Sequence, residues 1–304
     1  MITFIVRRLI WMVVTLWVVF TISFFLMRFA PGGPYMSEKV LPPEIEAQRK
    51  REYHLDKPLP VQYWLRIKQL ASGDLGRSTK TDVRVSRLIG EGLPVSLAMG
   101  LLALTIAFVV GMPAGILSAV FRGSGVDLSM MSVATVGIAL PNFVVAGFAI
   151  ILFVFTIPLL PAGGWGTLEQ LVLPAMCLGL PYAAYVARIA RTGMLDVLSQ
   201  DHIRTAQAKG LAPATVVLRH ALPTALLPVV SFLGPAVAGI LTGSPVVEQI
   251  FAIPGLGWHF VQSASNRDYP VAMGMVLLYT ALLYTMNLLV DLSYGVLDPR
   301  VEWK

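Results

Sequence analysis

The sequence predicts an all-α membrane protein with six transmembrane helices. Of its 304 residues, 56% are hydrophobic and only 13% are charged, whereas about 25% of residues are charged in ordinary soluble domains. Six segments with few or no charges are long enough to cross or nearly cross a bilayer, which takes about 20 apolar residues. These are Leu9–Met27, Leu93–Val120, Leu128–Ile157, Gln170–Ala187, Ala221–Val247 and Tyr269–Val290. Because unpaired backbone groups are costly in lipid, such segments form helices or a closed barrel, and these lack the alternation of barrel strands.

The first segment begins like a signal peptide, with the basic pair Arg7 and Arg8. Its apolar stretch is about 19 residues long, whereas that of a signal peptide is usually 7–15 residues, and no small-x-small cleavage site follows it. We therefore expect residues 1–29 to be a cytoplasmic N-terminus and a retained first helix.

The short connections between the predicted helices set the orientation, because Lys and Arg concentrate in cytoplasmic loops. Arg122 lies between the second and third helices, whereas the third connection, LLPAGGWG, has no basic residue. The fourth connection is the most basic, with Arg188, Arg191, Arg204, Lys209 and Arg219. Both termini and the 2–3 and 4–5 loops are therefore predicted to be cytoplasmic in a multi-pass plasma-membrane protein.

Residues 30–92 are predicted to be an extended extracytoplasmic loop. They carry eleven basic and eight acidic residues, but the charge rule weakens for loops beyond about 60 residues. A helix is expected around Glu44–Tyr53, and turns are expected at Pro42-Pro43 and at Gly73–Gly76. The segment is too short to bury much core of its own, so we expect it to pack on the outer face of the bundle or on a partner. The remaining residues, 93–304, then form a five-helix core.

The sequence lacks the residues that would power transport or catalysis. No ionisable residue lies at the apolar centre of a predicted span, and Asp291 lies near a span end, which argues against proton coupling but not against sodium coupling. No Gly-Lys dipeptide occurs, so the chain has no ATP-binding phosphate loop. Zinc-protease, serine-hydrolase and clustered Cys/His motifs are absent too. We therefore expect a protein that is not an enzyme and holds no cofactor or metal.

Uncharged polar residues within the spans are candidates for the lining of a translocation pathway. They are Ser132, Thr135, Asn142, Ser231 and Thr242. The spans also contain many glycines and prolines, which have two readings: ordinary close packing of membrane helices, or kinks that shape a pathway and its gate.

The 4–5 connection, assigned to residues 188–225, has the pattern of two short helices. SQDHIRTAQAKG predicts a helix with Ser199 or Asp201 as its N-cap and Gly210 as its stop. Pro213 then suits the first turn of a second helix. Small residues flanked by a few large apolar ones are typical of a helix that fits a partner's groove. The alternative is a basic helix resting on anionic lipid.

The same loop resembles the cytoplasmic motif of ABC importer permeases, written EAA-x3-G-x9-I-x-LP. Here Arg204-Thr205-Ala206, Gly210 and Leu222-Pro223 match in spacing, while Arg204-Thr205 replace Glu-Ala and His220 replaces Ile. The same replacements are typical of the peptide-permease branch of the family. That branch has a second Arg at the position of Gln207. The stretches LMRFAPGGPY, YHLDKPLPVQYW, LPAGGWG, GSPVVEQIFAIPGLG and VDLSYGVLDPRV, in this order, resemble the B-type membrane subunit of bacterial oligopeptide and dipeptide importers.

The resemblance implies a type I ABC importer permease fold and a set of partners. These are a second related permease, two ATPase subunits that carry ATP and Mg, an extracytoplasmic peptide-binding protein, a peptide substrate and membrane lipid, with no nucleic acid. It implies that the loop helix docks in a cleft of an ATPase and transmits its closure. The expected coupling residues are Asp201, Ile203, Arg204, Ala206, Lys209, Gly210 and Leu211, with Ile203 and Leu211 as apolar anchors.

The segment SPVVEQIFAIPGLG, which follows the fifth span, has two readings. It is either a re-entrant helix that caps the bundle or an external gate and docking surface for the binding protein. The candidates for the second reading are Glu248, Phe251, Pro254, Gly255, Arg267 and Asp268.

Other functional classes remain open at the level of sequence. A self-contained secondary transporter would show inverted repeats, and none is seen between the two halves. A membrane enzyme would gather ionisable residues at one depth, yet His54, His202, His220 and His259 are scattered along the chain. Within the ABC importer reading, LPPE and LPAGGW favour oligopeptide cargo, and dipeptides, nickel chelates or glutathione are the alternatives.

Overall fold

The computed structural model describes residues 2–29, 56–241 and 245–297. Helices make up nearly all of this part, and the isolated bridge between Arg77 and Arg84 is its only β pairing. The α-helices are α1 (Ile2–Phe29), α3 (Leu59–Ala71), α4 (Val85–Val120), α5 (Gly125–Ala139), α6 (Asn142–Ile150), α7 (Leu168–Leu198), α8 (Asp201–Ala208), α9 (Pro213–Thr215), α10 (Leu222–Ala225), α11 (Leu227–Leu241), α12 (Pro245–Ile250), α13 (Leu256–Ser265) and α14 (Tyr269–Leu297). Two π-helical segments, Ile151–Thr156 and Val216–Ala221, follow α6 and α9.

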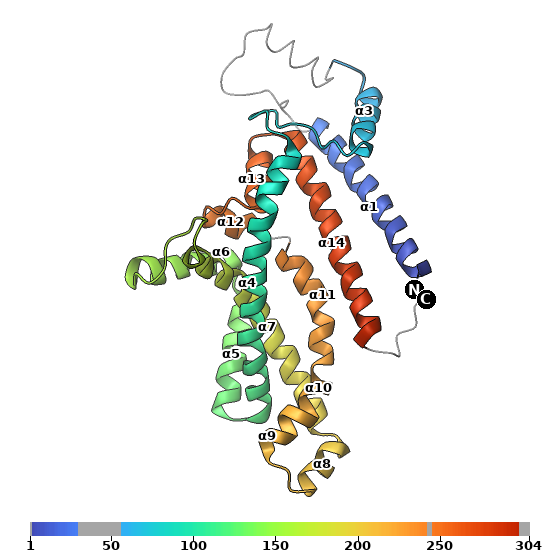
Figure 1. The fold of residues 1–304 in the computed structure, drawn as a ribbon. Helices are drawn as coiled ribbons and strands as arrows, with labels where there is room; N and C mark the ends of the chain where they lie inside the picture. Colours follow the sequence, from blue (N-terminus) through green and yellow to red (C-terminus); the bar gives the residue numbers. More distant parts are fainter. Residues whose placement is uncertain (1, 30–55, 242–244, 298–304) are drawn as a thin grey trace.

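Six spans were predicted, and five continuous helices of the described residues are long and apolar enough to cross a membrane, or six if a bent helix pair is counted as one span. The continuous spans are Ile2–Phe29, Val85–Val120, Leu168–Leu198, Pro213–Phe232 and Tyr269–Leu292. The sixth is the pair Gly125–Ala139 and Asn142–Thr156, which bends by 107°. The long helices run side by side, and α8 and α9 project from one end of the bundle while α3 and α13 lie at the other (Figure 1).

Helices α4 and α7 form the centre of the bundle through direct backbone contact. A Cβ atom added to Gly111 or Gly115 of α4 would lie 2.4 Å from the carbonyl oxygen of Ala183 or Ala187 on α7. One on Gly179 of α7 would lie 2.4 Å from the oxygen of Ala103. Small residues allow this approach, which is how membrane helices gain packing contacts without a hydrophobic driving force.

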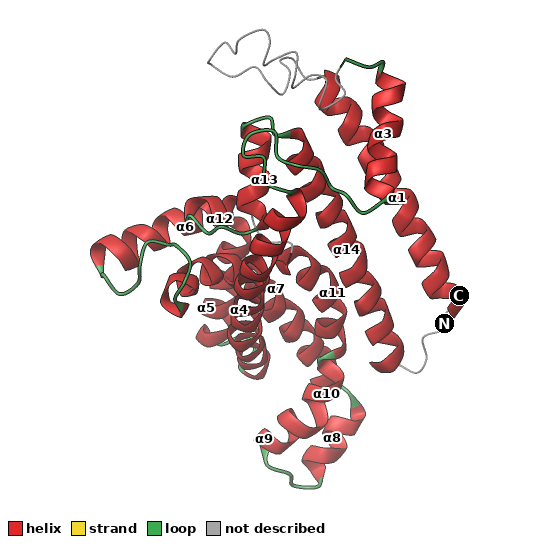
Figure 2. Cartoon of the chain, turned by 45° about the horizontal axis from the view of Figure 1, so that its top comes forward, coloured by secondary structure: helices red, strands yellow, loops and turns green. Residues whose placement is uncertain are grey.

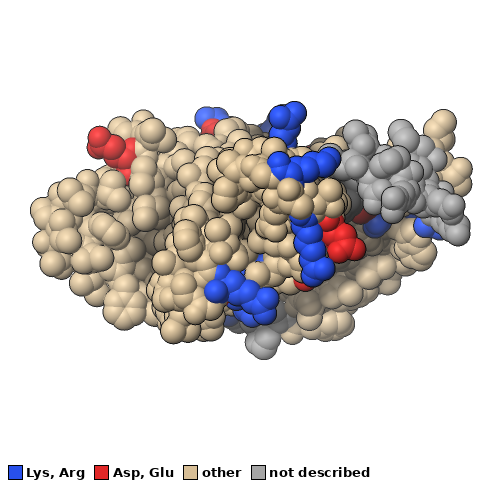
Figure 3. Space-filling view, turned by 90° about the horizontal axis from the view of Figure 1, so that it is seen from below, with Lys and Arg blue, Asp and Glu red and all other residues tan. Residues whose placement is uncertain are grey.

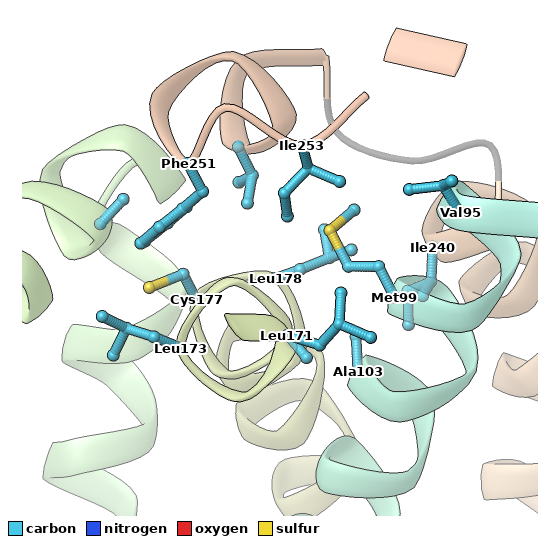
Figure 4. Close-up of a cluster of buried hydrophobic side chains, with 13 residues drawn as sticks. Val95, Met99, Ala103, Leu171, Leu173, Cys177, Leu178, Ile240, Phe251 and Ile253 are labelled. Atoms are coloured by element: carbon cyan, nitrogen blue, oxygen red, sulfur yellow. The ribbon is translucent and has the colours of Figure 1, made fainter. Parts of the chain in front are cut away.

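An apolar cluster fills the space between α4, α7 and the segment around α12. Met99 and Leu173 are fully buried in this cluster. Phe251 and Ile253, from the chain that follows α12, pack in the same cluster. Figure 4 shows these side chains converging from three directions on the α4–α7 pair. The cluster therefore fixes the position of α12 on the bundle.

Helix α1 lies at the periphery and packs mainly on α14 (Figure 1). The Arg8 guanidinium pairs with the carboxylate of Asp291, and the hydroxyls of Thr15 and Tyr284 are 2.7 Å apart. Large apolar side chains along the rest of α1, such as Trp11 and Trp17, are more than half exposed. This exposed surface suits contact with lipid chains.

Three predicted span boundaries are wrong. The third span is not one helix, because it breaks at Leu140 and Pro141, where the missing N–H of proline ends the hydrogen-bond ladder. The fourth does not stop at Ala187 but continues to Leu198, so the 4–5 loop is shorter than residues 188–225. The fifth does not reach Val247, since α11 ends at Leu241 and Val247 belongs to the separate helix α12.

The described part of the long first loop, residues 56–92, holds α3, a turn and the start of α4. The expected turns at Gly73 and Gly76 are confirmed, with φ of +80° and +84°, which glycine adopts at little cost. The predicted helix at 44–53 lies outside the described residues.

Candidate functional site

The loop between α7 and α10 is built as the sequence indicates, with one difference at its start. Gln200 is the N-cap of α8, while Ser199 ends α7 and Asp201 is the first residue of α8. The predicted capping roles of Ser199 and Asp201 are therefore wrong. Gly210 has φ of +75° and ends the helix, and Pro213 opens α9. The result is an eight-residue helix and a second short helix that project together below the bundle (Figure 2).

One face of α8 is used inside the chain. Ile203 is fully buried and Ala206 is 6% exposed, and both pack with Met194 and Val197 of α7 and with Val216. The expectation that Ile203 is an anchor in a partner's cleft is therefore corrected: its side chain attaches α8 to α7, and Ala206 faces the same way.

The rest of α8 and the turn that follows it, Lys209 to Leu211, are open and mostly polar. Asp201, Arg204, Lys209 and Gly210 are exposed, and Leu211 is 39% exposed. Arg204 and Asp201 lie 3.5 Å apart as an exposed pair, a kind of contact that contributes little stability. Blue Lys and Arg atoms outnumber red acidic ones on the visible face of this end (Figure 3). The exposed residues are thus available to a partner surface.

A partly buried ion pair connects this end of α7 with the turn between α4 and α5. Asp127 is held by Arg191 through two bonds, Nε to Oδ1 at 2.7 Å and Nη2 to Oδ2 at 2.8 Å. The Ser118 hydroxyl and the Gly123 N–H also donate to this carboxylate. Two parallel bonds fix orientation as well as distance, so α7 and the α4–α5 turn are held together at this end.

At the other end, Glu248 is a buried structural anchor. It is fully buried, and its carboxylate accepts hydrogen bonds from the Ser96 hydroxyl at 2.8 Å and from the Trp258 N–H at 3.0 Å. Ser96 in turn accepts from the Leu256 N–H at 2.8 Å. A Cβ on Gly255 would lie 2.4 Å from the Glu248 carboxylate. The PGLG turn is therefore folded tightly around this carboxylate, which joins α4, α12 and α13.

Three residues predicted to form an external gate or docking surface are not on the surface. Glu248, Phe251 and Asp268 are each 5% exposed or less. Asp268 is the acceptor for the Ser78 hydroxyl and the Thr79 N–H. Phe251 packs in the central cluster, and its carbonyl accepts the Gly164 N–H at 2.8 Å. These side chains hold the segment in place, so the assignment of a surface role to them is corrected.

Of the other members of that set, Pro254 and Arg267 are exposed while Gly255 is buried. Pro254 and Arg267 therefore remain available to an external partner.

A cavity of about 450 Å³ lies at the break between α5 and α6. Its wall includes Tyr182 and Tyr185 of α7, Phe232 of α11 and Asn142 at the start of α6. The rings of Tyr185 and Phe232 are 5.7 Å apart between centroids. The cavity also touches three prolines: Pro141 at the break between α5 and α6, Pro181 of α7 and Pro235 of α11. The site is aromatic and uncharged, and it adjoins the only bent span in the described part of the chain.

The structure brings only one of the predicted pathway residues to this cavity, namely Asn142. Ser132, Thr135 and Ser231 are exposed on their helices, and the hydroxyls of Thr135 and Ser231 donate to carbonyls four residues earlier. Thr242 lies outside the described residues. Within those residues, no three His, Cys, Asp or Glu side chains are grouped to hold a metal ion.

Two family models match the chain. The model of the binding-protein-dependent transport system inner membrane component matches residues 111–303, and the N-terminal model of the same membrane component matches residues 1–100. The chain belongs to this family.

Curated relatives match this permease over its whole length. It is 43% identical over 306 residues to the oligopeptide transport system permease protein OppB of Salmonella typhimurium, covering 100% of both chains. It is 41% identical to the dipeptide transport system permease protein DppB of Bacillus subtilis, covering 98% of this chain and 97% of that one.

Solved structures share the type I ABC importer permease fold. A chain of the inward-facing MetNI methionine ABC transporter aligns with a TM-score of 0.58 at 20% identity, covering 70% of this chain and 97% of that one. A chain of an amino acid ABC transporter aligns with a TM-score of 0.54 at 21% identity, covering 69% and 94%.

Sequence reasoning missed two features of the permease. The Asp127–Arg191 pair joins residues 64 positions apart, and the only signal was an acidic residue at the start of one span and a basic one at the end of another. Tyr182 and Tyr185 stand three residues apart on α7, a spacing that places both on one face of a helix, and this periodicity was the available signal.

Proposed function

We propose that this permease is the B-type membrane subunit of an ABC importer that carries oligopeptides across the bacterial plasma membrane, powered by two separate ATPase subunits. The observation that carries the proposal is the exposed polar surface of α8 and the turn after it, at one end of the bundle, with the buried side of α8 packed on the end of α7. The chain has no phosphate loop of its own, so the work must enter through a contact surface. The names of its full-length relatives supply the cargo class.

In this proposal α8 receives motion from an ATPase and passes it on to the bundle. Asp201, Arg204, Lys209, Gly210 and Leu211 form the contact, while Ile203 and Ala206 fasten α8 to α7. Asp127 and Arg191 then carry the displacement to the α4–α5 turn. A displaced α7 changes the shape of the cavity at the α5–α6 break, because Tyr182 and Tyr185 belong to the same helix.

The aromatic cavity is our proposed part of the translocation pathway. Aromatic faces and an amide bind peptides without requiring a fixed charge, which suits cargo with varied side chains. Selectivity would then be set mainly by an extracytoplasmic binding protein, for which Pro254 and Arg267 are exposed contact candidates. A second related permease would complete the pathway. Both termini and α8 face the cytoplasm in this proposal, in agreement with the basic short loops.

The test is ATPase coupling in proteoliposomes that contain both permeases and both ATPase subunits. We expect Arg204→Glu with Lys209→Glu to abolish the stimulation of ATP hydrolysis by the peptide-loaded binding protein. Arg7→Glu with Arg122→Glu changes the charge of the same end equally and should retain coupling. Normal stimulation in the Arg204/Lys209 variant would refute the proposed contact.

Dipeptide cargo is a second candidate, favoured by the similarity to dipeptide permeases. Competition of labelled pentapeptide uptake by unlabelled dipeptides separates the two. Oligopeptide transport predicts weak competition by dipeptides, and dipeptide transport predicts that they displace the label fully.

A further inference from the structure

The hydroxyl of Tyr182 reaches from α7 to the backbone of α11 at Gly239. A Cβ atom added to Gly239 would lie 2.6 Å from the Tyr182 hydroxyl oxygen and 3.7 Å from the ring carbon Cζ. The first distance is far below van der Waals contact, whereas the second is an ordinary contact. The lack of a side chain at position 239 therefore makes room for one atom, the hydroxyl oxygen of Tyr182.

Gly239 differs from the glycines that bring the central helices together. At Gly111, Gly115 and Gly179, an added Cβ would meet backbone carbonyl oxygens of the facing helix, so those glycines allow α4 and α7 to approach closely. At Gly239, the two atoms that an added Cβ would meet both belong to the side chain of Tyr182. Gly239 therefore accommodates the position of one side chain and not the approach of two helices.

The ring of Tyr182 has packed side chains and open space as its neighbours. It packs against the central apolar cluster, in which Met99 is fully buried. It also forms part of the wall of the cavity of about 450 Å³ at the α5–α6 break. Because protein interiors are close-packed, the cluster leaves no room for a displaced ring. A Tyr182 ring that is pushed away from Gly239 therefore moves into the cavity.

Gly239 also lies on the face of α11 that the cavity uses. Pro235 and Ala236 line the cavity, and residues three and four positions apart lie on one face of a helix. Gly239 is three positions after Ala236 and four after Pro235, and it is not part of the cavity wall. Its influence on the cavity therefore passes through Tyr182.

We propose that Gly239 is a specificity-determining position of the permease, which keeps the Tyr182 hydroxyl against α11 and thereby leaves the cavity wide enough for bulky side chains of a peptide. This inference rests on the proposed role of the cavity in peptide translocation. Gly239 is a positioning residue, because it acts through Tyr182 and does not touch the peptide. A larger residue at position 239 narrows the pathway for large side chains and leaves small ones unaffected.

The experiment measures uptake into proteoliposomes that contain both permeases, both ATPase subunits and the binding protein. The substrates are trialanine and a tripeptide with tryptophan between two alanines. Gly239→Ala is compared with Tyr182→Phe and with the two substitutions combined. Gly137→Ala is the matched control, because its Cβ would lie at an ordinary 3.6 Å from Ala184. Ala139→Trp narrows the cavity from the end of α5, independently of Tyr182.

We expect Gly239→Ala to lower the kcat for the tryptophan peptide about tenfold relative to trialanine, since one methyl-sized group in an apolar pocket changes discrimination by about this factor. KM should stay the same, because in the proposed function the binding protein captures the peptide. Tyr182→Phe removes the hydroxyl oxygen, and the Cβ at position 239 then meets the ring only at 3.7 Å. The combined variant should therefore recover uptake of the tryptophan peptide. Gly137→Ala should transport both peptides like the wild type.

Two results would overturn the proposal directly. Equal losses for the two peptides in Gly239→Ala would mean a general effect on folding or coupling, and not on specificity. A combined variant that recovers nothing would mean that Gly239 does not act through Tyr182.

Ala139→Trp distinguishes a failure of this proposal from a failure of the proposed function. If Ala139→Trp selectively slows the tryptophan peptide and Gly239→Ala does not, the cavity belongs to the pathway but Gly239 does not control it. If neither variant changes the preference between the two peptides, the role of the cavity in translocation is refuted as well.

Discussion

Replacing Ile203 by alanine distinguishes its two possible roles: an internal attachment of α8 to α7, and an apolar anchor in the cleft of an ATPase. Ile203 is fully buried against Met194, Val197 and Val216 within its own chain. The substitution removes three carbon atoms, worth about 0.8 kcal/mol each in lost burial. The cavity left behind adds to this, so the attachment of α8 to α7 should weaken by about 3 kcal/mol. A free-energy change of this size increases the population of the detached state roughly 100-fold.

Amide hydrogen exchange of residues 199–212 measures that population. The membrane subunits should be compared with and without the ATPase subunits. If Ile203 is an internal attachment, exchange in the Ile203→Ala variant rises about 100-fold in the absence of ATPase. Leu211→Ala is the matched control, because Leu211 is 39% exposed and its truncation should change exchange little.

Unchanged exchange in the ATPase-free Ile203→Ala protein, together with weakened ATPase binding, would refute the internal attachment by Ile203. That result would mean that Ile203 turns outward to a partner and that its burial in the chain is not maintained. Under the internal-attachment hypothesis, substrate-stimulated ATPase activity also falls, because a detached α8 cannot pull α7.

Three further predictions concern the bundle itself. Gly115→Leu should prevent stable assembly of the helix bundle, because even a Cβ at that position would lie 2.4 Å from the Ala187 oxygen. Gly147→Leu is at an open position and should behave like the wild type. Thermal unfolding followed by size-exclusion chromatography compares the two variants. Glu248→Ala should lower the unfolding free energy by about 3 kcal/mol, because it leaves buried donors unpaired. Glu248→Gln should lower the unfolding free energy by about 1 kcal/mol. Equal melting temperatures for the two variants would contradict the anchor role of Glu248. Asp127→Asn should lower the melting temperature through loss of the charge-assisted bonds to Arg191. Adding Arg191→Gln should lower it little further, and near-additive losses in this double-mutant cycle would contradict the pairing.

Composition and local pattern predicted a large part of this structure. The number of spans follows from apolar run length, because the bilayer has a fixed thickness and leaves no water for unpaired backbone groups. The stop at Gly210 and the start at Pro213 follow from the φ angles that these residues adopt. The glycine turns before α4 have the same origin.

Other features depend on residues far apart in the chain, and sequence pattern alone did not locate them. The resemblance placed Ile203 on a contact surface. The motif locates the helix, but it does not show which face of that helix is buried within the chain. The charges at Glu248 and Asp268 suggested surface positions, yet Ser96 and Ser78 lie 152 and 190 residues away and supply the hydrogen bonds that allow burial.

Hydrophobic run length and local motifs are enough to identify a multi-span membrane protein and its family. Which polar residues are anchors and which are available to partners depends on packing, as does the gathering of Asn142, Tyr182 and Phe232 around one cavity. Burial and charge compensation are set by contacts between distant segments, and local sequence carries no record of them.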